Sequence, residues 1–219
     1  MTVESIRSPV RRRRWIVAAG ALAFVTIAGS LWYQSQASGG RGPRLKPTTS
    51  AIEAPGATGC LVAGQDVQML LGTKGQAAQT PAGAAEFAAA LLRWFHQYPN
   101  PTGDAAKVAQ QEVLASTATY DPVAGLANNP NTSLALVPNG TAYHVTTTHG
   151  EYLVEAFDDT SARVLVGGAV VVDGQADPQL ELAVDYTIVW EGGAWRFESA
   201  RRADRSRLAV VGTNFTNGC

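Results

Sequence analysis

Nineteen consecutive residues without a charged side chain, Trp15 to Tyr33, constrain this chain more than any other feature of its sequence. As a helix that rises about 1.5 Å per residue, they would reach about 28 Å, close to the roughly 30 Å hydrocarbon thickness of a bilayer. The segment is apolar all round instead of on one face, which does not fit a buried core helix. We therefore predict a transmembrane helix over residues 15–33.

The charges beside this segment predict its orientation, because a basic run next to an apolar helix stays on the cytoplasmic side. Four arginines directly precede it: Arg11, Arg12, Arg13 and Arg14. We expect residues 1–14 to be a cytoplasmic tail and everything after Tyr33 to lie outside the cytoplasm, as in a single-pass protein of the cell membrane. The competing interpretation is a cleaved signal peptide with Ser35-Gln36-Ala37 as its cleavage site, although such peptides usually carry only about 7 to 15 apolar residues.

Residues 34–59 are rich in Gly, Pro, Ser, Thr and Ala and predict a flexible linker, which leaves residues 60–219 for one extracytoplasmic domain. The chain has a formal net charge of -1, and its first 14 residues hold five arginines against one glutamate, so the remainder is acidic. Interspersed acids and bases argue against direct binding of nucleic acid. One basic cluster is more simply a solvated face than a patch for an anionic partner. It consists of Arg201, Arg202, Arg205 and Arg207.

The two cysteines, Cys60 and Cys219, stand at the two ends of this domain. Outside the cytoplasm a disulfide persists, and an even number of cysteines favours pairing. Closing a loop of about 160 residues would contribute up to roughly 5 kcal/mol by the chain-entropy estimate. We hypothesise a disulfide that joins the ends of the domain, with two free thiols as the alternative.

The first half of the domain is predicted to form helices, preceded by a short lead-in segment from Cys60 onward. The pieces CLVAG and DVQMLLG, from Cys60 onward, are short, apolar and cut by glycine, so we expect them to be irregular or extended. Thr80 suits a helix N-cap, and apolar residues then recur at spacings of three and four, which predicts a helix from about Pro81 to Gln97. A weaker stripe predicts a second helix over Gly103 to Ser116, followed by a turn-rich stretch with Asp121-Pro122 as a breaker.

The second half has strand character, with segments rich in β-branched and aromatic residues between turn residues. The predicted strands are Thr141–Thr148, Glu151–Phe157, Ser161–Asp173, Gln179–Glu191 and Ala194–Arg201. Gly192-Gly193 between alternating apolar flanks predicts a hairpin, and Gly167-Gly168 predicts a bulge or bend. Helices followed by antiparallel strands indicate an α+β domain with its helices packed on one face of a curved sheet.

A long antiparallel meander ending in the aromatic hairpin YTIVWEGGAWRF resembles the nuclear-transport-factor-2-like (NTF2-like, or cystatin-like) α+β cone. With the tail, anchor and linker before it, the chain is similar to the VirB8 and TcpC group of conjugation and type IV secretion proteins. The helix TPAGAAEFAAALLRWF is similar to ectodomains encoded among transfer genes of Gram-positive, actinobacterial mobile elements. The resemblance implies a non-catalytic scaffold or docking subunit that contacts the membrane, contacts other secretion-machinery proteins and self-associates.

The sequence offers few groups for catalysis, and we expect neither an enzyme nor a bound metal or cofactor. The three histidines, His96, His144 and His149, lack metal-ligand spacing, and nucleophile-elbow, phosphate-loop and dinucleotide motifs are missing. Cones of this class can contain a pocket between the helices and the sheet. The alternatives to a scaffold are therefore a domain that binds a small apolar or cell-envelope molecule there and, with less support, an enzyme that uses the pocket as its active site. Six residues are candidates to line it: Tyr120, Asp121, Tyr143, His144, Asp185 and Tyr186.

Two outcomes would separate these functions. An interior filled by large side chains such as Phe87, Trp94 and Trp190 would favour the scaffold. An open pocket with converging polar groups would favour binding or catalysis.

Overall fold

The computed structural model describes residues 56–219, with positions 128 and 130 left out. The predicted cytoplasmic tail, transmembrane helix and nearly all of the linker lie outside the described residues, so these assignments stay predictions. Within the part of the chain that is described, no helix is both long and apolar enough to cross a membrane.

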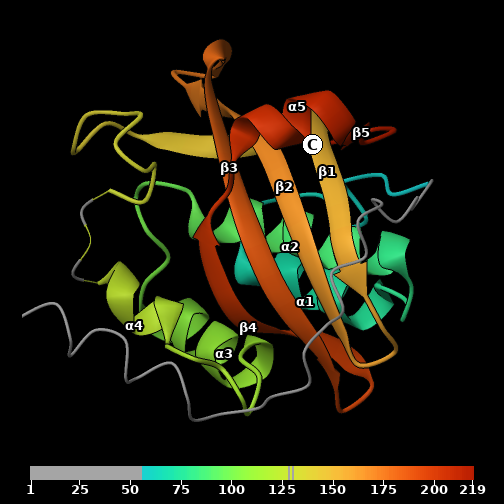
Figure 1. The fold of residues 1–219 in the computed structure, drawn as a ribbon. Coiled ribbons are helices and arrows are strands. Elements are labelled where there is room, and N and C mark those ends of the chain that lie inside the picture. The colour runs from blue at the N-terminus through green and yellow to red at the C-terminus, as the bar shows by residue number, and fades with distance from the viewer. Residues whose placement is uncertain (1–55, 128, 130) are drawn as a thin grey trace, which may run out of the picture. The chain divides into compact units, whose positions relative to one another are not determined.

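The described chain is an α+β fold in which helices come first and an antiparallel meander follows (Figure 1). The helices are α1 (Val67–Gln76), α2 (Pro81–Phe95), α3 (Gly103–Val113), α4 (Pro122–Leu126) and α5 (Arg205–Val211). The strands are β1 (Tyr143–Phe157), β2 (Ser161–Val172), β3 (Gln175–Glu191), β4 (Ala194–Arg202) and β5 (Thr213–Asn214). They pair antiparallel in the order β4-β3-β2-β1-β5.

Helix α2 is the centre of the core, and the structure confirms its prediction. The Thr80 hydroxyl accepts a hydrogen bond from the Gly83 amide at 3.1 Å and caps the helix, and Pro81 occupies the first turn. The helix contacts β1 and β2, and Phe87 and Trp94 are fully buried within the main apolar cluster. Large side chains therefore fill the central part of the space between the helices and the sheet.

The predicted irregular or extended lead-in is wrong for Val67–Gln76, which form helix α1. The Asp66 side chain accepts from the Met69 amide at 2.9 Å and starts the helix. Met69 and Leu70 are buried in the core. Because packing and an N-cap outweigh the unfavourable helix propensity of glycine, the two glycines inside α1 do not stop it. The short helices α4 and α5 were not predicted either.

Tight turns join the consecutive strands. Gly192 and Gly193 have φ of 65° and 83°, as the predicted hairpin requires. Asp173 and Gly174, with φ of 52° and 74°, make a second turn of the same kind. Consequently β3 begins at Gln175 and not at Gln179 as predicted.

The two strands predicted over 141–148 and 151–157 are one strand, β1, with a large bulge. Thr146 pairs with Ala169 and Glu151 with Gly167, so residues 147–150 face a single residue of β2. The predicted bend at Gly167-Gly168 lies opposite this bulge. A Cβ on Gly168 would lie 2.5 Å from the Thr146 carbonyl oxygen, so only glycine permits the close approach.

Both ends of the described chain meet at this bulge. The structure contains the hypothesised disulfide between Cys60 and Cys219, whose Cα atoms are 5.4 Å apart. Thr147 accepts from the Cys219 amide at 3.0 Å through its hydroxyl oxygen and donates from the same hydroxyl to the Gly59 carbonyl at 2.7 Å. The covalent bond and the hydrogen bonds of one threonine therefore hold the two ends at one place.

The other face of the sheet carries α5 and a small apolar cluster of Leu153, Leu165, Ala183 and Leu208. Three arginines of the predicted basic cluster bind carboxylates here: Arg201 to Asp185, Arg205 to Glu181 and Arg207 to Glu155. Because Asp185 and Glu155 are buried, these pairs neutralise charges that would otherwise be costly. The cluster therefore attaches α5 and β4 to the sheet.

Candidate ligand-binding pocket

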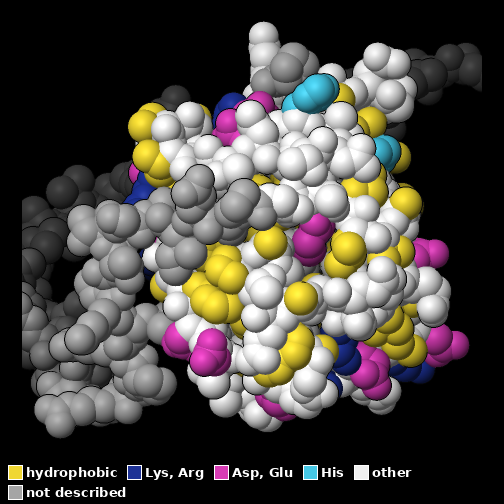
Figure 2. All heavy atoms as spheres, turned by 90° about the vertical axis from the view of Figure 1, so that its right-hand side faces the viewer, with side chains coloured by type: hydrophobic (Ala, Val, Ile, Leu, Met, Phe, Trp, Pro, Cys, Tyr) yellow, Lys and Arg dark blue, Asp and Glu magenta, His cyan; other side chains and the backbone are white. Residues whose placement is uncertain are grey.

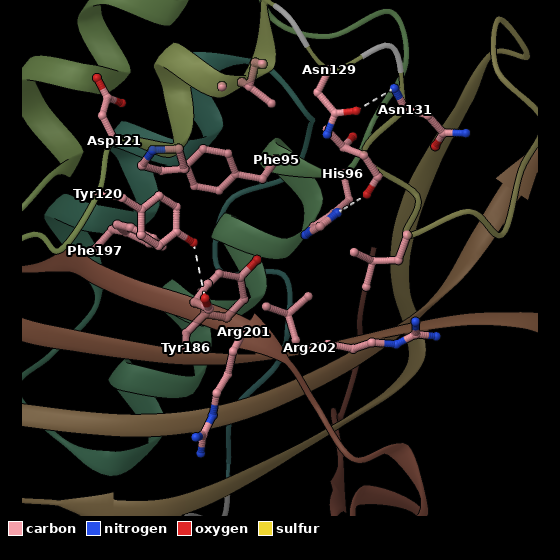
Figure 3. Close-up of a pocket in the computed structure, with 17 residues that line it drawn as sticks. Phe95, His96, Tyr120, Asp121, Asn129, Asn131, Tyr186, Phe197, Arg201 and Arg202 are labelled. Atoms are coloured by element: carbon pink, nitrogen blue, oxygen red, sulfur yellow. Dashed lines mark hydrogen bonds between the residues drawn. The ribbon is translucent and has the colours of Figure 1, made fainter. Parts of the chain in front are cut away.

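A cavity of about 420 Å³ opens where the end of α2, helix α4 and strands β3 and β4 meet (Figure 3). Its lining comes from the end of α2 and the residue after it, from α4 and its flanking loops, from the middle of β3 and from β4. The volume lies within the roughly 300 to 1,000 Å³ that is usual for small-molecule sites.

The walls of this pocket are mostly apolar and aromatic. Phe95 and Phe197 form its inner side with ring centroids 5.8 Å apart, and Tyr120 meets Phe197 edge to face at 5.6 Å. The rest of the apolar lining consists of Pro122, Leu126, Leu134, Val184 and Ala200. Such a surface gains free energy by covering an apolar ligand.

His96 places one polar atom in the pocket. Its Nδ1 lies 2.5 Å from the Thr132 carbonyl oxygen, and because a carbonyl only accepts, Nδ1 must carry the proton. Burial lowers the pKa of His96 to about 4, so the ring is neutral near pH 7 and Nε2 is a hydrogen-bond acceptor. Figure 3 shows this second nitrogen pointing into the cavity.

Tyr186 of β3 directs a hydrogen-bond donor, its hydroxyl group, towards the same pocket from the side of the sheet. Its side chain is 1% exposed, and within the described part of the chain its hydroxyl has no hydrogen-bond partner. Burial raises its pKa well above the usual value, so the hydroxyl keeps its proton. In Figure 3 the hydroxyl points towards the same part of the cavity as the free nitrogen of His96. An orphaned buried hydroxyl costs about 1 to 3 kcal/mol.

Two more of the predicted residues line the pocket but are engaged in local structure. Tyr120 donates to the Ala200 carbonyl at 3.3 Å, and burial raises its pKa. Asp121 caps α4 by accepting from the amides of Val123 and Ala124 at 2.9 and 3.1 Å, and its second oxygen accepts from Gln110. The carboxylate of Asp121 is therefore not free to act on a ligand.

The structure places the remaining three candidates outside the pocket. The Tyr143 hydroxyl bonds to the Thr132 hydroxyl at 2.7 Å, behind the lining. Asp185 lies in the ion pairs on the other face of the sheet. His144, whose pKa burial lowers, lies in β1 away from the cavity lining. The prediction that these three line the pocket is wrong. For Asp185 the reason is that neighbouring residues of a strand point to opposite faces, so it faces away from the side on which Tyr186 lies.

His96 was not among the six residues predicted to line the pocket. The signal that could have identified it is its position directly after the apolar stripe of α2, where the C-cap residue leaves the helix. Among the described residues, no cluster of three His, Cys, Asp or Glu side chains is placed to hold a metal ion.

Comparison with known proteins gives no match to any protein-family model, curated protein or solved structure.

Proposed function

We propose that residues 60–219 are a ligand-binding ectodomain that takes up a small, predominantly apolar molecule in the pocket. The observation that carries this proposal is the Tyr186 hydroxyl, which is buried, unpartnered among the described residues and directed towards the cavity from just behind its surface. Native proteins rarely leave a buried donor unsatisfied, and a ligand atom that accepts from Tyr186 would remove this cost.

The pocket is better suited to binding than to acid–base catalysis. A general base works best when its pKa lies near the working pH, whereas burial lowers the pKa of His96 to about 4. The carboxylate of Asp121 is occupied by amide hydrogen bonds. His96 can therefore position a ligand through Nε2 but is a poor proton acceptor near pH 7.

We propose further that the domain is an NTF2-like cone held outside the cytoplasm by an N-terminal transmembrane helix. Helices packed on an antiparallel meander support the first part. The Cys60–Cys219 disulfide supports the second, since such bonds persist in oxidising compartments.

A second candidate function is a docking subunit of conjugative transfer or type IV secretion, partnered by other membrane proteins or by a second copy. Helix α5 favours it, because Val210 and Val211 are 81% and 47% exposed there. Direct nucleic-acid binding has less support. The face in Figure 2 carries scattered acidic, basic and hydrophobic side chains without a broad basic area.

The test of ligand binding uses two matched glycine variants of the full chain. Gly125 lines the pocket and Gly75 does not, and a Cβ on either would meet nothing within 4 Å. We expect solvent extracts of purified wild type and Gly75→Trp to contain the same enriched small molecule by mass spectrometry, and Gly125→Trp to lose it. Identical extracts from all three proteins would refute ligand binding in this pocket.

A further inference from the structure

The two polar atoms of the pocket have opposite hydrogen-bonding needs. The Tyr186 hydroxyl has a proton to donate and no acceptor among the described residues. Nε2 of His96 has a lone pair, because the proton of the ring is on Nδ1 and bonds to Thr132. No hydrogen bond between the two side chains is present, although both point into the same part of the cavity (Figure 3).

We infer that the ligand carries a neutral hydroxyl group, which accepts a hydrogen bond from Tyr186 and donates one to Nε2 of His96. This inference rests on the proposed ligand-binding function and specifies the chemistry of the ligand. A hydroxyl is the smallest group that both accepts and donates. Its uptake would satisfy two pocket atoms with one ligand group.

Charged ligands fit this part of the pocket poorly. A carboxylate would put an acceptor beside the lone pair of Nε2. Of the two arginines in the lining, Arg201 is held by Asp185 at 2.7 Å, and the guanidinium of Arg202 extends away from Tyr186 and His96 in Figure 3. A cation would find no free carboxylate in the lining, since Asp121 accepts from α4 amides and from Gln110. A ketone or ether would satisfy Tyr186 but leave Nε2 without a donor.

The rest of the ligand is apolar and flat. Phe95, Phe197 and Tyr120 offer ring faces and edges, which favour an aromatic or fused-ring body. Because the Tyr186 hydroxyl is closed off from solvent, a neighbouring side chain must shift to admit the ligand oxygen. Tyr120 is suited to this shift, because it is 46% exposed and its hydroxyl donates a long hydrogen bond, of 3.3 Å, to the Ala200 carbonyl.

The test compares three probes of one shape: 2-naphthol, 2-methoxynaphthalene and naphthalene. The first accepts and donates, the second only accepts, and the third does neither. Binding to the ligand-free full chain in one detergent is measured as the rise in unfolding temperature over that of each protein without probe. Variants are Tyr186→Phe, which removes the donor, and His96→Asn, whose amide can still donate to Thr132 but lacks Nε2.

We expect Tyr186→Phe to weaken the binding of 2-naphthol and of 2-methoxynaphthalene by about tenfold each, which corresponds to the loss of one hydrogen bond of about 1.4 kcal/mol. His96→Asn should weaken the binding of 2-naphthol alone by a similar factor. Neither variant should change the affinity for naphthalene by more than about twofold. Because wild type and variant share the detergent, probe partition into micelles cancels in each ratio.

Two results would overturn the inference in different ways. If all three probes bind and neither variant changes their relative affinity, the ligand hydroxyl is wrong while the proposed binding function stands. If no probe binds and Gly125→Trp leaves the solvent extract unchanged, the proposed function itself fails and the inference fails with it.

Discussion

Replacing Tyr186 by phenylalanine should stabilise the ligand-free protein, although most substitutions of fully buried residues destabilise. The side chain is 1% exposed and its hydroxyl has no partner in the described part of the chain. Phenylalanine keeps the ring and its packing against Phe197, whose centroid lies 6.3 Å away. Burial of an unsatisfied hydroxyl costs about 1 to 3 kcal/mol, and small shifts of neighbours recover part of that, so we expect a gain of about 1 kcal/mol.

Tyr143→Phe is the matched control, because it removes the same atom from a buried tyrosine that has a partner. Tyr143 is 4% exposed, and its hydroxyl lies 2.7 Å from the hydroxyl of Thr132, itself 8% exposed. The substitution leaves Thr132 without this bond. We therefore expect a loss of about 1 to 2 kcal/mol.

Urea unfolding followed by tryptophan fluorescence measures both changes, since Trp94 and Trp195 are fully buried. With a slope of about 2 kcal/mol per molar urea, the midpoint should rise by about 0.5 M for Tyr186→Phe and fall by about 0.5 to 1 M for Tyr143→Phe. If both variants lose stability equally, the Tyr186 hydroxyl has a partner in the folded chain. A ligand at this position would then find no unpaired donor on Tyr186.

Three further predictions concern pH, the disulfide and two helix glycines. The free energy of unfolding should fall by up to about 3 kcal/mol as the pH drops from about 6.5 to about 4. In this range the unfolded chain binds a proton at His96, whereas the folded protein does not, because the pKa of His96 is about 4 there. His96→Asn should lack this part of the pH dependence. Reduction of Cys60–Cys219 should lower the unfolding free energy by up to about 5 kcal/mol, and an unchanged urea midpoint would contradict the loop-closure argument. Gly83→Ala should lose about 2 kcal/mol or more, since its Cβ would lie 2.0 Å from the Ala78 carbonyl oxygen. In Gly75→Ala the new Cβ would meet nothing within 4 Å, so the free energy of unfolding, measured by thermal unfolding, should rise by about 0.5 kcal/mol. Equal effects of the two substitutions would refute the steric reason.

Local signals predicted the elements that depend on local chemistry. Thr80 and Pro81 begin α2 as expected, and Gly192-Gly193 turn the hairpin between β3 and β4. Helix α1 was missed, because its glycines and short apolar pieces carry little periodicity and its stability comes from packing on α2. Such a contact between distant segments has no trace in a local window.

The candidate site was predicted in part for the same reason. Tyr120 and Tyr186 line the pocket as expected, whereas Asp185 lies on the opposite face. The alternation of side chains along a strand already implied that Asp185 and Tyr186 cannot line one cavity. That the Tyr186 hydroxyl has no partner among the described residues could not be predicted from the sequence, because it depends on where all the surrounding segments lie in the fold.

The strand order of the sheet determines when each hairpin can form during synthesis. Each of the strands β1 to β4 pairs with its neighbour in sequence, so the hairpins can form one after another as the chain grows. The hydrogen bonds of Thr147 are different, since its two partners, Gly59 and Cys219, lie far from it in the sequence on opposite sides. Because 159 positions separate Cys60 from Cys219, the disulfide can form only after all four long strands of the sheet have been synthesised.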